Sequence, residues 1–353
     1  MARRDHFHVL IVCSQQSGMQ AACRVFEHQT DSKFERVHTD LPYSLCLCRK
    51  WNGLPLTIAM VAQVKSGGTE TMKLVADLAN YFTVGMIAMT GICAGEEDKY
   101  NEIEYGTVVV ANRTTTESGG LEKADSKFES HARYKEVDKQ ILPAINELVA
   151  VKGSLSMDCI PSQSYRPSPR YVKELLLKSV LDSGGIKMED LVATIESKLP
   201  GIEILALNEV LDKIMNDSKP WISTEDKLLK ATDEGKVYAN DQSSFPCGDH
   251  DVIAAVSASI GSVLTEVNNL DKEMETLKQR MEDRDIKAID REAHFFMEQA
   301  TDSFSPGLPI VMKGISDYGT EPSKLSYYRV HAASTSAAFL RHFVAQKNFL
   351  ISK

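Results

Sequence analysis

The sequence FHVLIVCSQQSGMQAACRVF, residues 7–26, sets a pattern that the chain repeats. Its beginning, FHVLIVC, is an apolar run of strand length, and a polar break separates it from a helical pattern over 19–26. The alternation continues with strand patterns at 55–61 and 85–90 and a helical pattern between them at 70–82. This order is typical of an α/β sheet with helices packed on its faces.

The remaining patterns predict one large domain that carries an insertion. Residues 106–111 and 308–313 read as further strands, and residues 324–346 as a long closing helix. The stretch between them has a different, mainly helical texture after a Pro/Ser-rich segment. The predicted organisation is a domain formed by 1–152 and 239–353, interrupted by an insertion at 153–238.

The insertion contains three helical patterns, at 171–183, 188–199 and 207–217, followed by the strand-like GKVYA at 235–239. A winged-helix module is one interpretation, because three short helices precede this strand-like segment. The acidic surroundings argue against a DNA-binding role for it.

An apolar seam follows the insertion. Its members are spaced alternately three and four residues apart, which predicts one narrow apolar stripe along a helix that we place at 256–285. Either this helix packs on its own domain, or it forms a coiled-coil contact between subunits. The seam consists of Ile260, Val263, Val267, Leu270, Met274, Leu277 and Met281.

Composition excludes several classes of protein. The 353 residues include 40 Lys and Arg against 49 Asp and Glu, a net charge of −9, so a nucleic-acid partner is not expected. No apolar run reaches the length of a membrane span, and we expect a cytoplasmic protein. The seven cysteines form no paired C-x-x-C set, so we expect neither a metal site nor a disulfide framework.

Three segments combine small or charged residues with an apolar strand or helix. In AMTGICAG, residues 88–95, small residues at the carboxyl end of a strand let a ligand approach the backbone, although such turns are also common packing features. In AIDREAHFF, residues 288–296, the carboxylates are either helix caps or ligands for a polyol such as ribose. In VMKGISDYG, residues 311–319, Asp317 is either a general acid or a simple turn residue.

In this order and at these distances, the three segments resemble the nucleoside phosphorylase superfamily, which includes purine and uridine phosphorylases, nucleotide nucleosidases and methylthioadenosine/adenosylhomocysteine nucleosidases. TGICAG is similar to the family's T-G-S-A-G-G turn, DRE to its E-M-E ribose segment, and KGISDYG to its R-A-I-S-D segment. The opening IVCSQQSGMQAA and the later CGDHDVIA also resemble family segments. The resemblance covers about 7–150 and 240–350 and leaves the insertion unexplained.

The resemblance implies a three-layer α/β/α sandwich with a central mixed, partly closed sheet, in a homo-oligomer. It also implies cleavage of the N-glycosidic bond of a purine nucleoside or nucleotide. In that reaction Asp317 protonates or hydrogen-bonds the base, Ser316 orients Asp317, and Glu292 holds the ribose hydroxyls. The other substrate-binding residues implied are Arg291, Asp290, Thr90, Gly91, Ile92, Cys93, Ala94, Ser66, Gly67, Gly68, Asp251 and Val252.

The chain also departs from the family pattern. The Glu that activates water in hydrolytic members is matched by Gly18, and the Arg that binds phosphate in hexameric phosphorylases by Met89. Arg24 and Lys65 remain as alternative anion-binding cations. Arg291 replaces a Met under the ribose, and a cation there could reach a phosphate on the substrate.

The aromatic residue that stacks on the base in hydrolytic members is matched by Asp251, so Phe245 or Tyr318 would have to replace it. No cofactor is implied, although phosphate is conceivable as a co-substrate. Hydrolysis is favoured over phosphorolysis. The alternative function is a nucleoside- or nucleotide-binding sensor or interaction domain with impaired catalysis, and a third is a pure scaffold.

Overall fold

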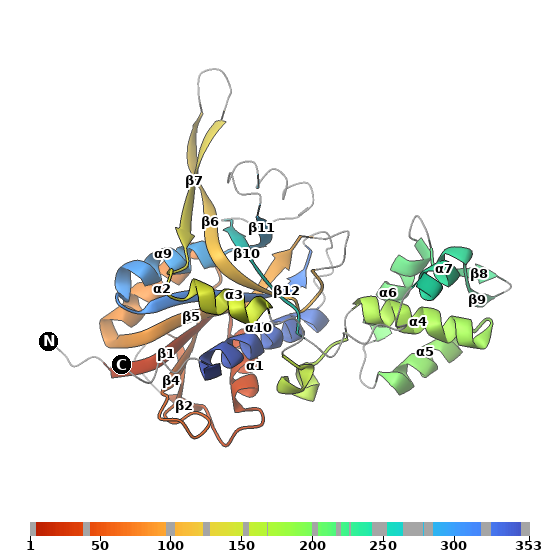
Figure 1. Cartoon of the computed structure of the whole chain (residues 1–353), viewed down its shortest axis with the longest axis horizontal. Coiled ribbons are helices and arrows are strands. Elements are labelled where there is room, and N and C mark those ends of the chain that lie inside the picture. The colour runs from red at the N-terminus through yellow and green to blue at the C-terminus, as the bar shows by residue number, and fades with distance from the viewer. Residues whose placement is uncertain are drawn as a thin grey trace. The chain divides into compact units, whose positions relative to one another are not determined.

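The computed structural model of the chain forms two compact units (Figure 1). One unit comprises Met1–Tyr165 and Ile253–Lys353, and the other comprises Arg166–Val252. The structure describes residues 5–37, 43–96, 103–122, 128–150, 155–167, 169–199, 204–216, 220–225, 227–241, 253–263, 278, 285–318 and 326–346.

The larger unit is built on a 10-stranded mixed sheet. Most strands follow the path β11-β10-β6-β12-β5-β1-β4-β3-β2, and β7 pairs with β6 outside this path. The strands are β1 (Asp5–Cys13), β2 (Glu35–Val37), β3 (Ser44–Cys48), β4 (Ile58–Ala62), β5 (Phe82–Gly95), β6 (Val108–Glu122), β7 (Phe128–Glu136), β10 (Ala255–Ser262), β11 (Ile286–Asp290) and β12 (Leu308–Asp317).

Part of this sheet closes on itself. Strand β11 pairs in parallel with β10 and also, in antiparallel register, with the end of β5, where Ala288 opposes Gly95. Strand β5 therefore continues to Gly95, because it pairs with β12 as far as Ala94 and with β11 at Ala94 and Gly95. The turn predicted within residues 90–95 is wrong. The predicted mixed, partly closed sheet is confirmed.

Helices cover this sheet in two pairs, α1 with α10 and α2 with α9. Successive residues of β12 show that the pairs lie on opposite faces, because side chains of a strand alternate. A Cβ on Gly314 would enter the backbone of α10 at Ala332, whereas the neighbouring Lys313 contacts the residues that begin α9. The helices are α1 (Gln16–Glu27), α2 (Gly68–Tyr81), α3 (Leu142–Ala150), α9 (Ala293–Ser303) and α10 (Ser326–Gln346).

The helix predicted at 256–285 is wrong at its beginning. Residues Ala255–Ser262 form β10, which lies between β6 and β11 in the sheet. Short apolar runs suit a buried strand as well as a helix, and sheet pairing on both sides decides between them here. Residues 264–277 and 279–284 lie outside the described part of the chain. The coiled-coil alternative, which depends on these residues, stays a prediction.

The smaller unit contains helices and a hairpin. An isolated bridge pairs Ile186, between α4 and α5, with Leu229 of the hairpin formed by β8 and β9. The winged-helix module stays a prediction. The predicted strand GKVYA is wrong, because it lies inside α7 after the acidic first turn of that helix. The elements are α4 (Pro169–Ser183), α5 (Met188–Lys198), α6 (Ile204–Asn216), β8 (Ile222–Glu225), β9 (Leu228–Ala231) and α7 (Asp233–Asp241).

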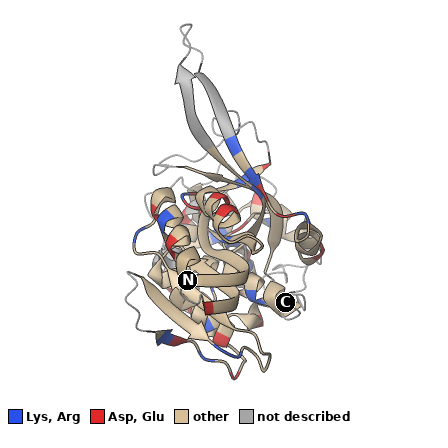
Figure 2. Ribbon diagram, turned by 90° about the vertical axis from the view of Figure 1, so that its left-hand side faces the viewer, with Lys and Arg blue, Asp and Glu red and all other residues tan. Residues whose placement is uncertain are grey.

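The division between the units differs from the boundaries at 153 and 238. Residues before Arg166 stay with the larger unit, because Leu155 and Ile160 are buried in its core and Leu155 accepts a backbone hydrogen bond from Ile253. Charges of both signs are interspersed along the described chain (Figure 2). No helix of the described residues is long and apolar enough to cross a membrane.

Candidate active site

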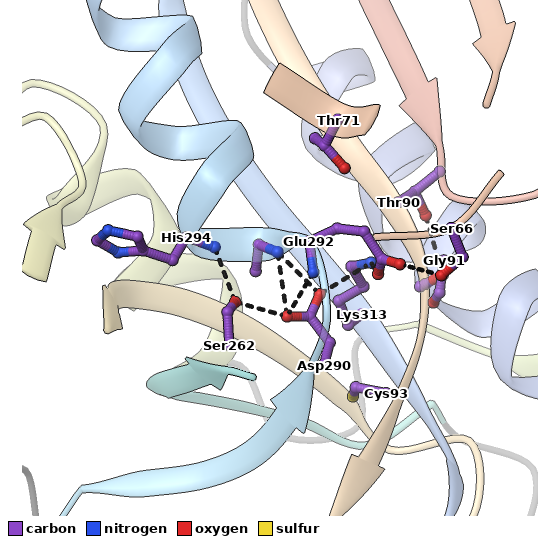
Figure 3. Close-up of polar contacts among 12 residues, drawn as sticks. Ser66, Thr71, Thr90, Gly91, Cys93, Ser262, Asp290, Glu292, His294 and Lys313 are labelled. Carbon is purple, nitrogen blue, oxygen red and sulfur yellow. Dashed lines mark hydrogen bonds and ion pairs between the residues drawn. The ribbon is translucent and has the colours of Figure 1, made fainter. Parts of the chain in front are cut away.

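A buried lysine lies at the centre of the polar residues on the α9 side of the sheet (Figure 3). Lys313 of β12 is 0% exposed, and its Nζ lies 3.1 Å from Asp290 Oδ2 and 3.5 Å from Glu292 Oε2. Burial alone lowers the pKa of Lys313, but the two carboxylates outweigh it and raise that pKa above its usual value. Lys313 is therefore a buried cation held between two carboxylates.

Asp290 joins the end of β11 to the start of α9. Its Oδ1 accepts hydrogen bonds from the Ser262 hydroxyl at 2.8 Å and from the backbone N–H of Glu292 and Ala293. The Ser262 hydroxyl in turn accepts the N–H of His294. The sequence allows the carboxylates of this segment to be either helix caps or ligands for a polyol. Asp290 has the geometry of a cap, because it accepts hydrogen bonds from N–H groups that the start of a helix leaves unpaired.

Glu292 is held differently, by the loop before α2. Its Oε1 accepts hydrogen bonds from the Ser66 hydroxyl and, at 3.1 Å, from the Gly67 N–H, while Oε2 faces Lys313. Gly67 has φ +132°, a conformation that favours glycine, and it precedes α2. A turn far away in the sequence thus fixes one oxygen of this carboxylate, and β12 fixes the other.

Gly91 of β5 brings Ser14 close to this cluster. A Cβ added to Gly91 would lie 2.6 Å from Ser14 Oγ and 3.6 Å from Lys313 Nζ, so glycine leaves room for the hydroxyl beside the cation. Lys313 and Gly91 are partners in the parallel register of β12 and β5. The neighbouring Thr90 points to the other face, where its hydroxyl contacts Ser336 of α10.

Ser316 and Asp317 lie at the end of the same strand, β12. A register shift pairs Ile315 with Cys93 and Asp317 with Ala94, which leaves Ser316 as the extra residue of a bulge. Ser316 Oγ donates a hydrogen bond to Asp317 Oδ2 at 2.8 Å. Bulges of this kind re-aim side chains and are frequent beside active sites.

The structure brings together part of the predicted site. Glu292, Ser66 and Gly67 are in contact, Asp290 adjoins them through Lys313, and Gly91 adjoins Lys313. The others lie around this group in different settings. Arg291 has its Nε buried, Gly68 is covered by the Phe295 ring, Cys93 is buried with a thiol pKa raised well above its usual value by desolvation, and Ile92 and Ala94 are half-buried in β5.

Neither alternative anion-binding cation contacts this cluster. Arg24 is exposed in the last turn of α1, whereas Ser14 lies just before the first turn of the same helix. Lys65 is exposed just before Ser66. Gly18 lies in the first turn of α1 with no atom within 4 Å of an added Cβ. Asp251, Val252 and Phe245 lie outside the described residues.

Lys313 and Ser14 were missed by the sequence analysis. A signal for Lys313 existed, because a lysine within the apolar run LPIVMKGI must be paired if the strand is buried. Its carboxylate partners could not be identified from the sequence, because only the folded sheet brings Lys313 of β12 close to Asp290 at the end of β11 and to Glu292 just after it. Ser14 carried no signal of its own.

Comparison with protein-family models and with curated protein sequences gives no match for this chain.

Solved structures do match it. The methylthioadenosine/adenosylhomocysteine nucleosidase of Neisseria meningitidis, in complex with methylthio-immucillin-A, has a TM-score of 0.54 at 10% identity, covering 96% of this chain and 99% of that one. The Helicobacter pylori enzyme of the same name scores 0.54 at 13% identity, covering 97% and 99%. The futalosine hydrolase of H. pylori scores 0.53 at 13% identity, covering 97% and 98%. This chain therefore has the fold that its resemblance to the nucleoside phosphorylase superfamily implies, at low sequence identity.

Proposed function

We propose, from a fold shared with methylthioadenosine/adenosylhomocysteine nucleosidases, that this protein cleaves the N-glycosidic bond of a purine nucleoside or nucleotide and releases the free base. One observation carries the proposal. A single strand, β12, holds the cation that orders Glu292 and, a few residues later, the Ser316–Asp317 pair. This strand therefore orders the carboxylate for the sugar through Lys313 and itself carries the acid for the base.

Glu292 would bind the ribose. Ser66 and Gly67 donate to one of its oxygens and Lys313 faces the other, so the carboxylate is ordered before any substrate arrives. An ionised carboxylate has about four lone-pair positions, which leaves capacity for a sugar hydroxyl. Such a charge-assisted hydrogen bond is about twice as strong as a neutral one.

Asp317 would protonate, or donate a hydrogen bond to, the purine as it leaves. Bond cleavage places electrons on the base and positive charge on the ribose, so a proton donor at the base and a carboxylate at the sugar stabilise the same transition state. The hydrogen bond from Ser316 holds the Asp317 carboxyl in one orientation. A donor fixed in this way does not have to be ordered during the reaction.

Water is the nucleophile that this site favours. Lys313 offers little attraction to a phosphate ion, because two carboxylates already match its charge, and Arg24 lies at the other end of α1. The Ser14 hydroxyl beside Gly91 is placed to orient a water molecule. The water would bond to C1′ and release its proton to solvent, while the base would leave with a proton from Asp317 that solvent then restores. The step therefore balances without a carboxylate at position 18.

The absence of a carboxylate from residues 14–18 also favours a second candidate, a domain that binds the nucleoside or nucleotide without cleaving it. Both candidates use the same contacts of Glu292 and Asp317. They differ in turnover alone.

Release of free base, measured by chromatography with and without phosphate, separates the two candidates. Purified protein is incubated with adenosine, inosine, guanosine, methylthioadenosine, AMP and ATP. We expect release without phosphate and a loss of at least about 100-fold in Asp317→Asn. The control Asp302→Asn changes an exposed carboxylate of α9 and should keep full activity. A ligand-induced rise in melting temperature without base release would establish binding alone.

A further inference from the structure

Arg291 lies between Asp290 and Glu292 in the sequence, yet it pairs with neither of them. Its Nε is buried without a hydrogen-bond partner, and the ion pairs of the described residues at this site all involve Lys313. An arginine that is partly removed from water and left unpaired is costly, because its N–H groups lose hydrogen bonds to solvent.

Neither adjacent carboxylate forms an ion pair with this guanidinium, because both face Lys313. Asp290 accepts from Ser262 and from the first N–H groups of α9, and it faces Lys313. Glu292 accepts from the loop before α2 and also faces Lys313. Among the described residues, the site therefore contains a cation held in ion pairs, Lys313, and a guanidinium that forms none, Arg291.

The position of Arg291 connects its charge to the sugar-binding region. Its Nη2 lies 3.8 Å from the point that a Cβ on Gly67 would occupy. The N–H of the same Gly67 donates to Glu292 Oε1. The guanidinium and the carboxylate proposed to hold the ribose therefore both lie near the same loop residue, Gly67.

We propose that Arg291 binds a phosphate group carried by the ribose, so that the substrate is a purine nucleotide rather than a nucleoside. This inference rests on the proposed function for the assignment of Glu292 to the ribose. A guanidinium offers donors in a planar fork that matches two oxygens of a phosphate. A guanidinium near Gly67 is compatible with a phosphate on the 5′-, 3′- or 2′-oxygen, and the substrates chosen for the test distinguish these positions.

The test measures kcat/KM for base release from adenosine and guanosine and from their 2′-, 3′- and 5′-monophosphates. We expect one monophosphate position to exceed the nucleoside at least about tenfold. In Arg291→Met the ratio of kcat/KM for that monophosphate to kcat/KM for the nucleoside should fall by about 10- to 100-fold, since a hydrogen bond to a charged group is lost only with the nucleotide. Arg24→Met removes an exposed arginine away from the site and should keep the preference.

Several results would overturn the inference. The nucleoside could be cleaved as fast as every monophosphate, or Arg291→Met could keep the preference. Stimulation of nucleoside cleavage by inorganic phosphate that disappears in Arg291→Met would assign the guanidinium to a co-substrate instead.

Failure of the proposed function gives a different pattern. If no base is released from any compound, thermal shifts with the same nucleosides and monophosphates still test Arg291. Stabilisation by a monophosphate that exceeds that of the nucleoside and is lost in Arg291→Met would support the phosphate contact without catalysis. Equal shifts, or none, would reject it.

Discussion

Replacement of Lys313 by methionine tests the ion cluster that orders the site. The side chain is 0% exposed and lies within 3.5 Å of two carboxylates that are themselves buried. Removing one partner of a buried ion pair costs about 3–5 kcal/mol, because a buried charge is left without compensation. With two carboxylates affected, we expect Lys313→Met to lower the free energy of unfolding by about 5 kcal/mol. That is a large share of the 5–15 kcal/mol of a typical domain.

Urea denaturation at pH 7, followed by circular dichroism, measures this loss. The control is Lys73→Met, which removes an exposed ion pair with Glu70 at 3.3 Å and should cost less than about 1 kcal/mol. Combining Lys313→Met with Asp290→Asn and Glu292→Gln removes all three charges and should recover part of the stability. A loss below about 1 kcal/mol, or equal to that of Lys73→Met, would refute the reasoning.

The same variant has a defined pH dependence. The folded-state pKa of Lys313 is raised above the ordinary value of 10.5, so its contribution is fully present below pH 10.5 and is lost as pH rises through the folded pKa. The stability difference between the natural protein and Lys313→Met should therefore stay constant from pH 7 to about 10.5 and shrink above it. A difference that already shrinks between pH 7 and 9 would contradict this assignment.

Three further predictions concern the surroundings of the site. Ser66→Ala should raise KM for base release about tenfold with little change in kcat, because Glu292 loses a donor, and a fall in kcat alone would contradict this. Gly314→Ala should destabilise the protein by about 3 kcal/mol in urea denaturation, since its Cβ would enter the α10 backbone, whereas Gly18→Ala, in open space, should stabilise it by about 0.5 kcal/mol. Burial lowers the pKa of His294 below 6.5, so stability should fall as pH drops below 6.5, and His294→Gln should flatten that slope in thermal melts.

Several features of the fold could be predicted from local sequence alone. The strand that opens the chain, the helix after it and the closing helix have regular apolar patterns of sufficient length, and β1, α1 and α10 occupy those positions. β10 could not be predicted. Its short apolar run suits a helix as well as a strand, and only pairing with β6 and β11 makes the strand favourable.

The same distinction applies to the candidate site. The sequence determined the α/β fold class and pointed to Glu292, Ser316 and Asp317, because these residues lie in short motifs beside apolar strands or helices. The tertiary structure decided which charges meet. It placed Lys313 against two carboxylates and Arg291 beside Gly67, where the guanidinium forms no ion pair with a carboxylate of the described residues. Local patterns follow from neighbouring residues, whereas electrostatic pairing in a closed sheet depends on contacts between segments that are far apart in the chain.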